Sequence, residues 1–599
     1  MEPTSLSRRS VLVGGSLAAA AGAVGLRPTT AHAKNERGWV TSTLNRMTRE
    51  EKIGQLFVQE VYGSDADTPD ERNIPQYGVA KPSEVVKKFH LGGVIYFAWT
   101  DSFVNPLQVA KLSNGLQKAS LAAAAKAPVP LAVATDQEQG VVTRFGPPAT
   151  QFPGSMALGA GRSAEDARTA AAITGKELRA VGINVDFAPD SDVNVNPENP
   201  VIGVRAFSSD PALVAELAAA QIDGYQLDGK VSSSTKHFPG HGDTATDSHY
   251  GLPVITHTRQ EWEEIDLPPF KAAIAHDVDM VMTAHLLVPA LDDSGDPATL
   301  SKPIITGILR EELGYDGVVI TDALMMEGVR EKYGDAEVAV RALEAGVDQL
   351  LMAPAPMDAW KAIEEALESG RLKWRDIDDK VRRILTAKYR RGIVAEPMAD
   401  ESKIDSIVGA DAHEAAAAEV TDGTVTLIKN DAGTLPLAAK DHKILVTGYG
   451  VTTTKLVASE LTARGAQATA LDSGTKPTDA KIAEVLAAAK NNDTVIVLTN
   501  KAWDQKVTDP NGQQQKLVKQ LHDSGVDLVV VAVRDPYDIN RFDQVSTYVA
   551  TYSYSPVAPP ALVRMLTGEV PPAGKLPVDI PTADDPDQVL YPFGHGLSY

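Results

Sequence analysis

Eight short apolar runs recur through the first part of the chain, and each is separated from the next by a longer segment in which apolar residues return with helical spacing. Short, continuously apolar runs are typical of parallel strands that helices cover on both faces. Eight strand–helix repeats in succession predict an α/β fold of the (β/α)8, or TIM-barrel, type. The predicted strands span residues 55–58, 93–97, 131–135, 184–188, 231–236, 280–283, 317–321 and 349–352.

A second, smaller α/β domain is predicted after the barrel. An acidic stretch of small residues at 396–411 has the character of a linker, so we assign residues 34–395 to the barrel and residues 412–599 to an α/β sandwich. Gly448-Tyr449-Gly450 follows its first predicted strand without the third glycine of a nucleotide-binding fingerprint, which favours a tight turn. The predicted strands of this domain span residues 444–447, 494–499, 528–533 and 547–551.

The first 33 residues have the features of an export signal. Arg8-Arg9 precedes an apolar run over residues 11–26, and Ala31-His32-Ala33 provides a cleavage site. Together they predict a twin-arginine signal peptide at residues 1–33 and an extracellular protein. An uncleaved anchor is the alternative, although the run is shorter than the roughly 20 residues of a membrane-spanning helix. The chain has no cysteine, which excludes disulfides, and its net charge of −22 argues against nucleic acid as a partner.

Polar residues follow the ends of several predicted strands. Active sites of such barrels lie at the carboxyl-terminal rim, where the ends of all the strands meet. Side chains that are far apart in the sequence are therefore expected to converge there. The residues in these positions are Asp136, Asp190, Asp192, Lys236, His237, His285 and Asp322.

The densest polar cluster is the run KHFPGHGDTATDSH at residues 236–249, which begins where the fifth predicted strand ends. Pro239 excludes a helix there, so imidazoles and carboxylates stand on a loop beyond a strand, as in many catalytic sites. Two alternatives stay open, a solvated polar loop and a zinc site made by His237, His241 and His249. Because the spacing matches no common zinc motif and there is no cysteine, no metal is predicted.

Several other motifs make the chain resemble glycoside hydrolase family 3 over nearly all of its length after the signal. Gln139 is a departure, because it replaces the first glycine of the family's D-x-E-G-G segment. The matching motifs are EKIGQL at 51–56, DQEQG at 136–140 with Arg144, DFAP at 186–189, RAF at 205–207, VITD at 319–322, GKLP at 574–577 and YPFGHGLSY at 591–599.

The run at 236–249 is similar to the β-N-acetylglucosaminidase branch of that family, in which a loop histidine paired with an aspartate replaces the usual carboxylic acid. The resemblance implies that Asp322 is the nucleophile, His249 the acid/base and Asp247 its partner. It implies exo removal of terminal N-acetylglucosamine from peptidoglycan fragments or chitooligosaccharides in a blind-ended pocket, without a cofactor. The implied sugar-binding residues are Asp136, Arg144, Arg205, Lys236 and His237.

This assignment is consistent with the chemistry of a retaining glycosidase. Such an enzyme needs a nucleophile beside the anomeric carbon and an acid/base beside the leaving oxygen. Asp247 stands two residues before His249 and can orient its ring. A neutral imidazole places no second negative charge beside Asp322. An anionic acceptor could therefore approach, and phosphate could replace water.

Alternatives remain both for the roles of individual residues and for the function of the whole protein. Asp322 could cap a following helix, and Arg205, Lys236 and His237 could form a structural ion network at the rim. The function could be that of a broad β-glucosidase, a β-glycoside phosphorylase, a zinc hydrolase or a non-catalytic carbohydrate-binding protein. Gly240 and Gly242 suggest a mobile lid. We expect the second domain to support the barrel and to form part of the cleft wall, and the oligomeric state is not predicted.

Overall fold

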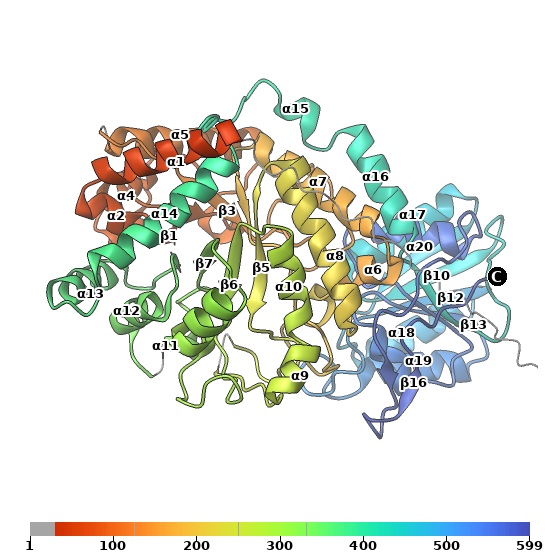
Figure 1. The fold of residues 1–599 in the computed structure, drawn as a ribbon. Helices are drawn as coiled ribbons and strands as arrows, with labels where there is room; N and C mark the ends of the chain where they lie inside the picture. The colour runs from red at the N-terminus through yellow and green to blue at the C-terminus, as the bar shows by residue number, and fades with distance from the viewer. Residues whose placement is uncertain (1–29, 125, 249–250, 331) are drawn as a thin grey trace, which may run out of the picture.

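A closed barrel of eight parallel strands forms the first part of the molecule (Figure 1). The computed structural model describes residues 30–599, apart from residues 125, 249, 250 and 331 and the side chains of residues 30–33. The strands follow the order β7-β6-β5-β4-β3-β2-β1-β8, and a bridge between Ile320 and Gln349 joins β7 to the start of β8. Their bounds are β1 Phe57–Glu60, β2 Gly93–Ile95, β3 Ala132–Thr135, β4 Val185–Asp186, β5 Ser232–Phe238, β6 Met280–Thr283, β7 Val318–Ile320 and β8 Leu350–Leu351.

All eight predicted barrel strands are confirmed, with shifts of one or two residues at their ends. The first begins later than predicted because Gln55 is the C-cap of the preceding helix α2 (Arg49–Gly54). β5 extends to Phe238, so His237 joins Lys236 in the strand itself rather than lying on the loop beyond it. The α/β barrel fold is therefore correct, and the charged rim is fixed by strand backbone.

The helices outside the barrel begin where side chains can cap them. Asn105, Ser163 and Asp210 each accept a hydrogen bond from a backbone N–H in the first turn of the helix that follows. Residues 259–275 form two helices instead of one, with a break before Pro268-Pro269, because proline is tolerated only in a first turn. These helices are α5 Pro106–Ala123, α7 Ala164–Ala180, α8 Pro211–Asp223, α9 Arg259–Glu264, α10 Leu267–Ala275, α12 Asp335–Ala345, α13 Pro356–Glu368 and α14 Trp374–Arg390.

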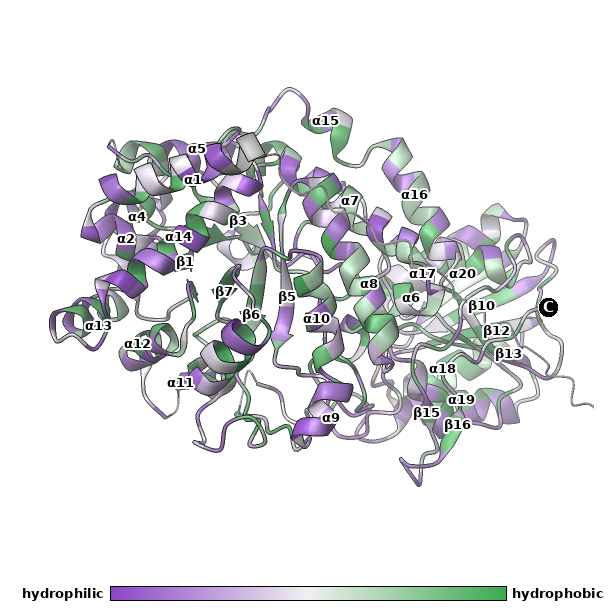
Figure 2. Cartoon of the chain, viewed as in Figure 1, coloured by the Kyte–Doolittle hydropathy of each residue, from purple (hydrophilic) through white to green (hydrophobic). Residues whose placement is uncertain are grey.

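The second domain contains a six-stranded sheet in the order β11-β10-β12-β13-β14-β9, in which only β9 is antiparallel to its neighbour. The sequence did not predict β9 and β11, which lie at the two edges of the sheet and lack a long apolar run; the residues of β11 are exposed or half-buried. The central strands are mostly hydrophobic, whereas α9 on the barrel is mostly hydrophilic (Figure 2). The bounds are β9 Thr426–Asn430, β10 Lys443–Gly448, β11 Gln467–Asp472, β12 Thr494–Thr499, β13 Asp527–Ala532 and β14 Thr547–Ala550.

Two segments connect the barrel to the second domain. The acidic stretch predicted as a linker contains one helical turn, α15 (Ile404–Ile407), and leads into α16 (Asp411–Asp422), which runs toward the second domain (Figure 1). The carboxyl-terminal tail returns to the barrel, where the carbonyl of Pro577 accepts hydrogen bonds from the backbone N–H and the hydroxyl of two adjacent serines, Ser209 and Ser208. Among the residues that the structure describes, no helix is both long and apolar enough to cross a bilayer.

Candidate active site

A cavity of about 470 Å³ opens at the carboxyl-terminal rim of the barrel. It lies where β3, β5 and β7 end, so residues from distant parts of the chain meet around one space. His249, the predicted acid/base, lies outside the described residues. The structure brings the other predicted site residues together in the lining of this cavity: Asp136, Arg144, Arg205, Lys236, His237, Asp247 and Asp322.

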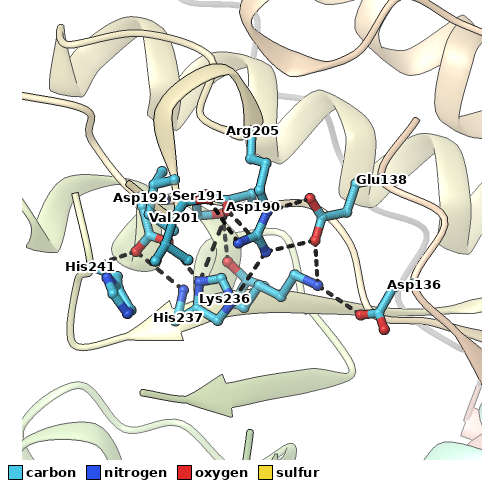
Figure 3. A network of polar contacts seen from close by, with 12 residues as sticks. Asp136, Glu138, Asp190, Ser191, Asp192, Val201, Arg205, Lys236, His237 and His241 are labelled. Carbon is cyan, nitrogen blue, oxygen red and sulfur yellow. Dashed lines mark hydrogen bonds and ion pairs between the residues drawn. The ribbon is translucent and has the colours of Figure 1, made fainter. Parts of the chain in front are cut away.

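A buried ion network lines one part of the cavity (Figure 3), which we call its closed end because the side chains of Lys236 and Glu138 there are only 2% and 3% exposed. The Lys236 ammonium lies 2.9 Å from Asp136 and 2.6 Å from Glu138. Glu138 also accepts two hydrogen bonds from the Arg205 guanidinium, at 2.8 and 2.9 Å. These residues are therefore paired with each other, as one alternative proposed, and they line the cavity as well. Pairing fixes the side chains in position, which is what a sugar-binding surface needs.

Burial and pairing act in opposite directions on the charges of this network. Burial raises the pKa of Glu138, but Arg205 and Lys236 outweigh it and hold that pKa well below its usual range. Burial likewise lowers the pKa of Lys236, while Asp136 and Glu138 raise it by more. Glu138 and Lys236 thus stay ionised at neutral pH, and the closed end carries fixed charges of both signs.

His237 is held as a neutral ring. Its Nδ1 lies 2.7 Å from a carboxylate oxygen of Asp192, and its Nε2 lies 3.4 Å from Arg205. Burial and then the Arg205 charge lower the pKa of His237 to about 4. Behind the ring, burial and the neighbouring Asp192 raise the pKa of Asp190 to about 8. His237 can therefore donate or accept a hydrogen bond in the cavity, but it is a poor source of a proton.

Asp190, Asp192 and His237 place potential ligand atoms within 4.8 Å of one another, which tests the metal alternative. The Arg205 guanidinium lies 3.6 Å from Asp190 and repels a cation at this place. The two ring nitrogens of His241, a member of the alternative zinc set, already face hydroxyl oxygens of Thr244 and Ser248 at 2.9 and 3.0 Å. These donor groups fit a hydrogen-bonded scaffold better than a metal site.

Asp322 follows β7 at the base of the cavity. Its Oδ1 accepts a hydrogen bond of 2.7 Å from the backbone N–H of Ala323. The next helix, α11 (Glu327–Arg330), begins five residues later, so the helix-cap alternative is wrong. Burial raises the pKa of Asp322, but His237, His285 and then Lys236 hold it below its usual value. Asp322 is thus an ionised carboxylate that strand backbone and its neighbours keep in place.

The loop that carries Asp247 is anchored at its base. Gly240 has φ +131°, and a side chain there would meet Asp266 at 2.7 Å; one at Gly242 would meet the carbonyl oxygen of Val193 at 1.8 Å. Both glycines therefore allow close packing, which contradicts our use of them as hinges of a lid. His241 is buried between them, and burial lowers its pKa to about 3.

A histidine outside the predicted set clamps this loop to the barrel wall. His257 lies 3.2 Å from Asp243 on the loop and 2.7 Å from Asp266, at the start of α10. Hydrogen bonds to Asp243 and Asp266 raise the pKa of His257 to about 10. A protonated His257 therefore joins two carboxylates, one of which precedes Asp247 by four residues in the chain.

Several residues of the cavity were not predicted from the sequence. Glu138 belongs to the DQEQG motif at 136–140. Because it follows Asp136 by two residues just after β3, its position could have predicted that it lines the cavity. Trp99, which is 51% exposed and stacks on Phe97, follows β2 at the same rim. Arg534 and Tyr554 come from the second domain, and no local pattern shows which surface of one domain will face the other.

Comparison with known families places both parts of the chain. The model of the glycosyl hydrolase family 3 N-terminal domain matches residues 48–387, and that of the family 3 C-terminal domain matches residues 425–599. These two ranges correspond to the barrel and to the second sheet of the structure.

Individual proteins are similar over almost the whole chain. Beta-hexosaminidase A of Pseudoalteromonas piscicida is 34% identical over 554 residues, which cover 83% of this chain and 90% of that protein. A beta-N-acetylglucosaminidase/beta-glucosidase of Cellulomonas fimi is 28% identical over 569 residues and covers 90% of this chain and 95% of its own. A solved family 3 β-N-acetylglucosaminidase from Paenibacillus sp. str. FPU-7 superposes with a TM-score of 0.80 at 37% identity, covering 90% and 99% of the two chains.

Proposed function

The chain belongs to glycoside hydrolase family 3, and from that membership we propose that it is an exo-acting, retaining β-N-acetylglucosaminidase. The observation that carries the proposal is the position of Asp322, an ionised carboxylate in the same cavity as Asp247 and a closed end of fixed charges. The names of the similar proteins from Pseudoalteromonas and Paenibacillus, a β-hexosaminidase and a β-N-acetylglucosaminidase, support this choice within the family.

In the first step, the Asp322 carboxylate attacks the anomeric carbon from below. The bond to the leaving oxygen breaks, that oxygen takes a proton from His249, and a glycosyl ester forms on Asp322. Asp247 orients the His249 ring. The choice of His249 is supported by the state of the other two histidines near the loop, because burial keeps the pKa of His237 at about 4 and that of His241 at about 3.

In the second step, water replaces the departed group. His249 has given up its proton and now takes one from the water, whose oxygen attacks the anomeric carbon and releases the Asp322 carboxylate. Two displacements at the same carbon retain the β configuration. A neutral imidazole suits the second step because it adds no negative charge close to the ester.

The closed end of the cavity supports recognition of a single terminal sugar. Asp136 can accept hydrogen bonds from ring hydroxyls, and Arg205, Lys236 and His237 can donate them. Because pairing within the network already offsets the charges, the surface presents fixed donors and acceptors rather than a net charge. A chain end enters this space, whereas the middle of a polysaccharide would need an exit that the network occupies.

The proposal is tested by initial rates of the purified protein on aryl β-N-acetylglucosaminide and aryl β-glucoside in phosphate-free buffer. We expect a strong preference for the acetamido sugar and a β-configured first product by NMR. Comparable or reversed rates would replace the proposal with a broad β-glucosidase, a second candidate favoured by the double name of the Cellulomonas relative. Absence of turnover on both would favour the carbohydrate-binding alternative.

Two finer points belong to the same proposal. Phosphate in place of water in the second step would yield a sugar 1-phosphate, so that product, measured with added phosphate, separates a phosphorylase from a hydrolase.

We also propose that the protein is exported and acts on extracellular peptidoglycan fragments or chitooligosaccharides. The motif for this, Arg8-Arg9, lies outside the described residues. Replacement of both arginines by lysine, followed by fractionation of the culture, tests export.

A further inference from the structure

His285 is a buried polar residue just beyond β6 to which the proposed mechanism gives no part. Its position after a barrel strand placed it among the residues expected at the rim. It is 0% exposed, and it does not belong to the lining of the cavity. A buried imidazole is retained for the groups that it bonds, so the role of His285 has to be sought in its protein partners.

One ring nitrogen of His285 reaches the residue that follows the nucleophile. Nε2 lies 3.1 Å from the carbonyl oxygen of Ala323, which can only accept, so Nε2 carries the hydrogen. The backbone N–H of Ala323 donates in turn to Oδ1 of Asp322, at 2.7 Å. Ala323 is therefore held by His285 at its carbonyl, while its N–H holds the Asp322 carboxylate.

The bond from His285 continues the register of the barrel sheet beyond the ends of two neighbouring strands. β6 pairs with β7 at Met282 and Ile320. These two residues are 38 positions apart in the chain, and so are His285 and Ala323. A side chain thus joins the two chain segments at the rim, where backbone pairing joins them lower in the barrel.

The turn after Asp322 is tied to strands on both of its sides. Toward β8, the N–H of Leu324 donates to the carbonyl of Leu351 at 2.9 Å. Within the turn, the N–H of Met326 donates to the same carbonyl that His285 bonds, at 3.1 Å. Toward β6, the bond comes from the His285 side chain. Substitution of this one residue therefore loosens one side of the turn and leaves its backbone bonds in place.

Two threonines fix the orientation of the His285 ring. Its Nδ1 lies 2.7 Å from the hydroxyl oxygen of Thr299, which lies 2.8 Å from that of Thr283. The Thr299 hydroxyl is also 3.0 Å from the carbonyl of Ala284. All these residues are 0% exposed. Rotation of the ring would leave buried polar groups unpaired, so the network keeps Nε2 directed at the turn after Asp322.

We propose that His285 is a positioning residue for the nucleophile: through Ala323 it holds the Asp322 carboxylate in the orientation from which the anomeric carbon is attacked. The inference rests on the proposed function, because it needs Asp322 to be the nucleophile. Misplacement of a reacting group by about 1 Å lowers a rate on the order of 100-fold. His285 should therefore control the rate of attack and not the binding of the sugar, because it does not line the cavity.

The test measures the attack by Asp322 separately from the other steps. The probe is the β-fluoride of N-acetylglucosamine with a second fluorine on ring carbon 5. A carboxylate oxygen of Asp322 bonds to the anomeric carbon, the carbon–fluorine bond there breaks, and fluoride leaves with little need of a proton. The ring fluorine slows hydrolysis of the ester, so mass spectrometry of the intact protein follows its formation. The saturating rate constant reports on attack, and the half-saturating probe concentration reports on binding.

Three variants, His285→Leu, His285→Asn and His285→Gln, separate the two ring nitrogens. The amide nitrogen of glutamine can take the place of Nε2, whereas that of asparagine reaches only the place of Nδ1. We expect His285→Leu and His285→Asn to lower the saturating rate constant on the order of 100-fold. His285→Gln should recover most of this loss, and the half-saturating concentration should stay the same in all three.

The control is His413→Leu. The His413 ring bonds the carboxylate of Glu177 at 2.7 Å, outside the cavity. This variant should lose stability and keep both constants of the wild type. Melting temperatures of all the variants show how much stability each has lost.

Wild-type rate constants in His285→Leu and His285→Asn would overturn the inference. An equal loss in His285→Gln and His285→Asn would also overturn it, because packing and not the bond to Ala323 would then explain the effect. If His285→Leu does not fold, the comparison of glutamine with asparagine gives the answer. A wild-type protein that forms no ester on Asp322 would contradict the proposed function itself, and that result differs from normal trapping by the wild type and the variants alike.

Discussion

The ammonium of Lys236 lies 2.6 Å from a carboxylate oxygen of Glu138, and the side chains are only 2% and 3% exposed. Glu138 also holds Arg205, so a single carboxylate pairs with two buried cations at the closed end of the cavity. Removal of one partner of a buried ion pair leaves an uncompensated charge, which costs much more than the pair contributes. Glu138 is therefore expected to matter for both folding and sugar binding.

Replacement of Glu138 by glutamine keeps the shape and removes the charge. We expect it to lower the free energy of unfolding by about 3 to 5 kcal/mol and to raise KM, because Lys236 and Arg205 would repel each other. Urea unfolding and steady-state kinetics on an aryl substrate measure both effects. Glu177→Gln is the control: that carboxylate is buried and bonded to Thr150 and His413, outside the cavity, so stability should fall while KM is kept. Wild-type stability of Glu138→Gln would contradict the argument.

Two aspartates at opposite ends of β7 give a sharp test of the nucleophile. Asp322 follows the strand and faces the cavity, whereas Asp316 precedes it and is 93% exposed. We expect Asp322→Asn to lower kcat on the order of 10⁴-fold with little change in melting temperature, since the backbone N–H of Ala323 still has an acceptor. Asp316→Asn should retain wild-type kcat. Turnover by Asp322→Asn close to that of the wild type would remove Asp322 from the mechanism.

The fold was readable from the sequence because most barrel strands are short, buried and largely apolar, as at residues 280–283. The edge strand β11 was not, because its half-exposed residues leave no such run. The same logic holds for the site. Asp136 and Asp322 follow strands, so their convergence at one rim is dictated by topology.

Other site residues depended on information that a local pattern does not contain. Arg534 reaches the cavity through the packing of one domain against another, and His257 reaches Asp243 across a loop. The glycines of that loop were misread, because glycine is required equally by a hinge and by close packing against a backbone such as that of Val193. Only the three-dimensional neighbours of Gly242 distinguish these two uses.

Lys388, a buried residue of α14, should make stability depend on pH. Its ammonium donates to Gln55 Oε1 and to the carbonyl of Gly92, and burial lowers its pKa to about 7. The unfolded value is roughly 10.4, so the unfolded chain holds the proton more tightly. The free-energy cost of burying the charged ammonium is complete below about pH 7. It disappears as the pH rises toward the pKa of the unfolded chain.

We therefore expect the melting temperature of Lys388→Met, relative to that of the wild type, to be highest at pH 6. This relative gain should disappear by pH 10. Melting temperatures of both proteins across this range measure the difference. Lys361→Met, at a site 76% exposed, should show no such trend. A constant difference between Lys388→Met and the wild type at every pH would mean that the lysine keeps an ordinary pKa when folded.

His257 should link pH to both stability and catalysis, because it clamps the loop that carries Asp247. Its pKa is raised to about 10 by Asp243 and Asp266, against an unfolded value of roughly 6.5. The folded state thus binds the proton more tightly. The stabilisation is complete below about pH 6.5 and is lost as the pH rises through about 10.

Replacement of His257 by glutamine removes the charge that joins the two carboxylates. We expect the melting temperature of His257→Gln to lie below that of the wild type at pH 6 and to approach it above pH 10. We also expect kcat/KM to fall roughly tenfold at neutral pH, because loss of the clamp displaces Asp247. His276→Gln removes a similar pair with Asp223, whose oxygen is 3.2 Å from Nδ1, and it should affect stability but not kcat/KM, because His276 does not line the cavity. If both variants lowered kcat/KM equally, general destabilisation would explain the loss. If only His257→Gln did so, the loop anchored at Asp243 would be the element that positions the acid/base.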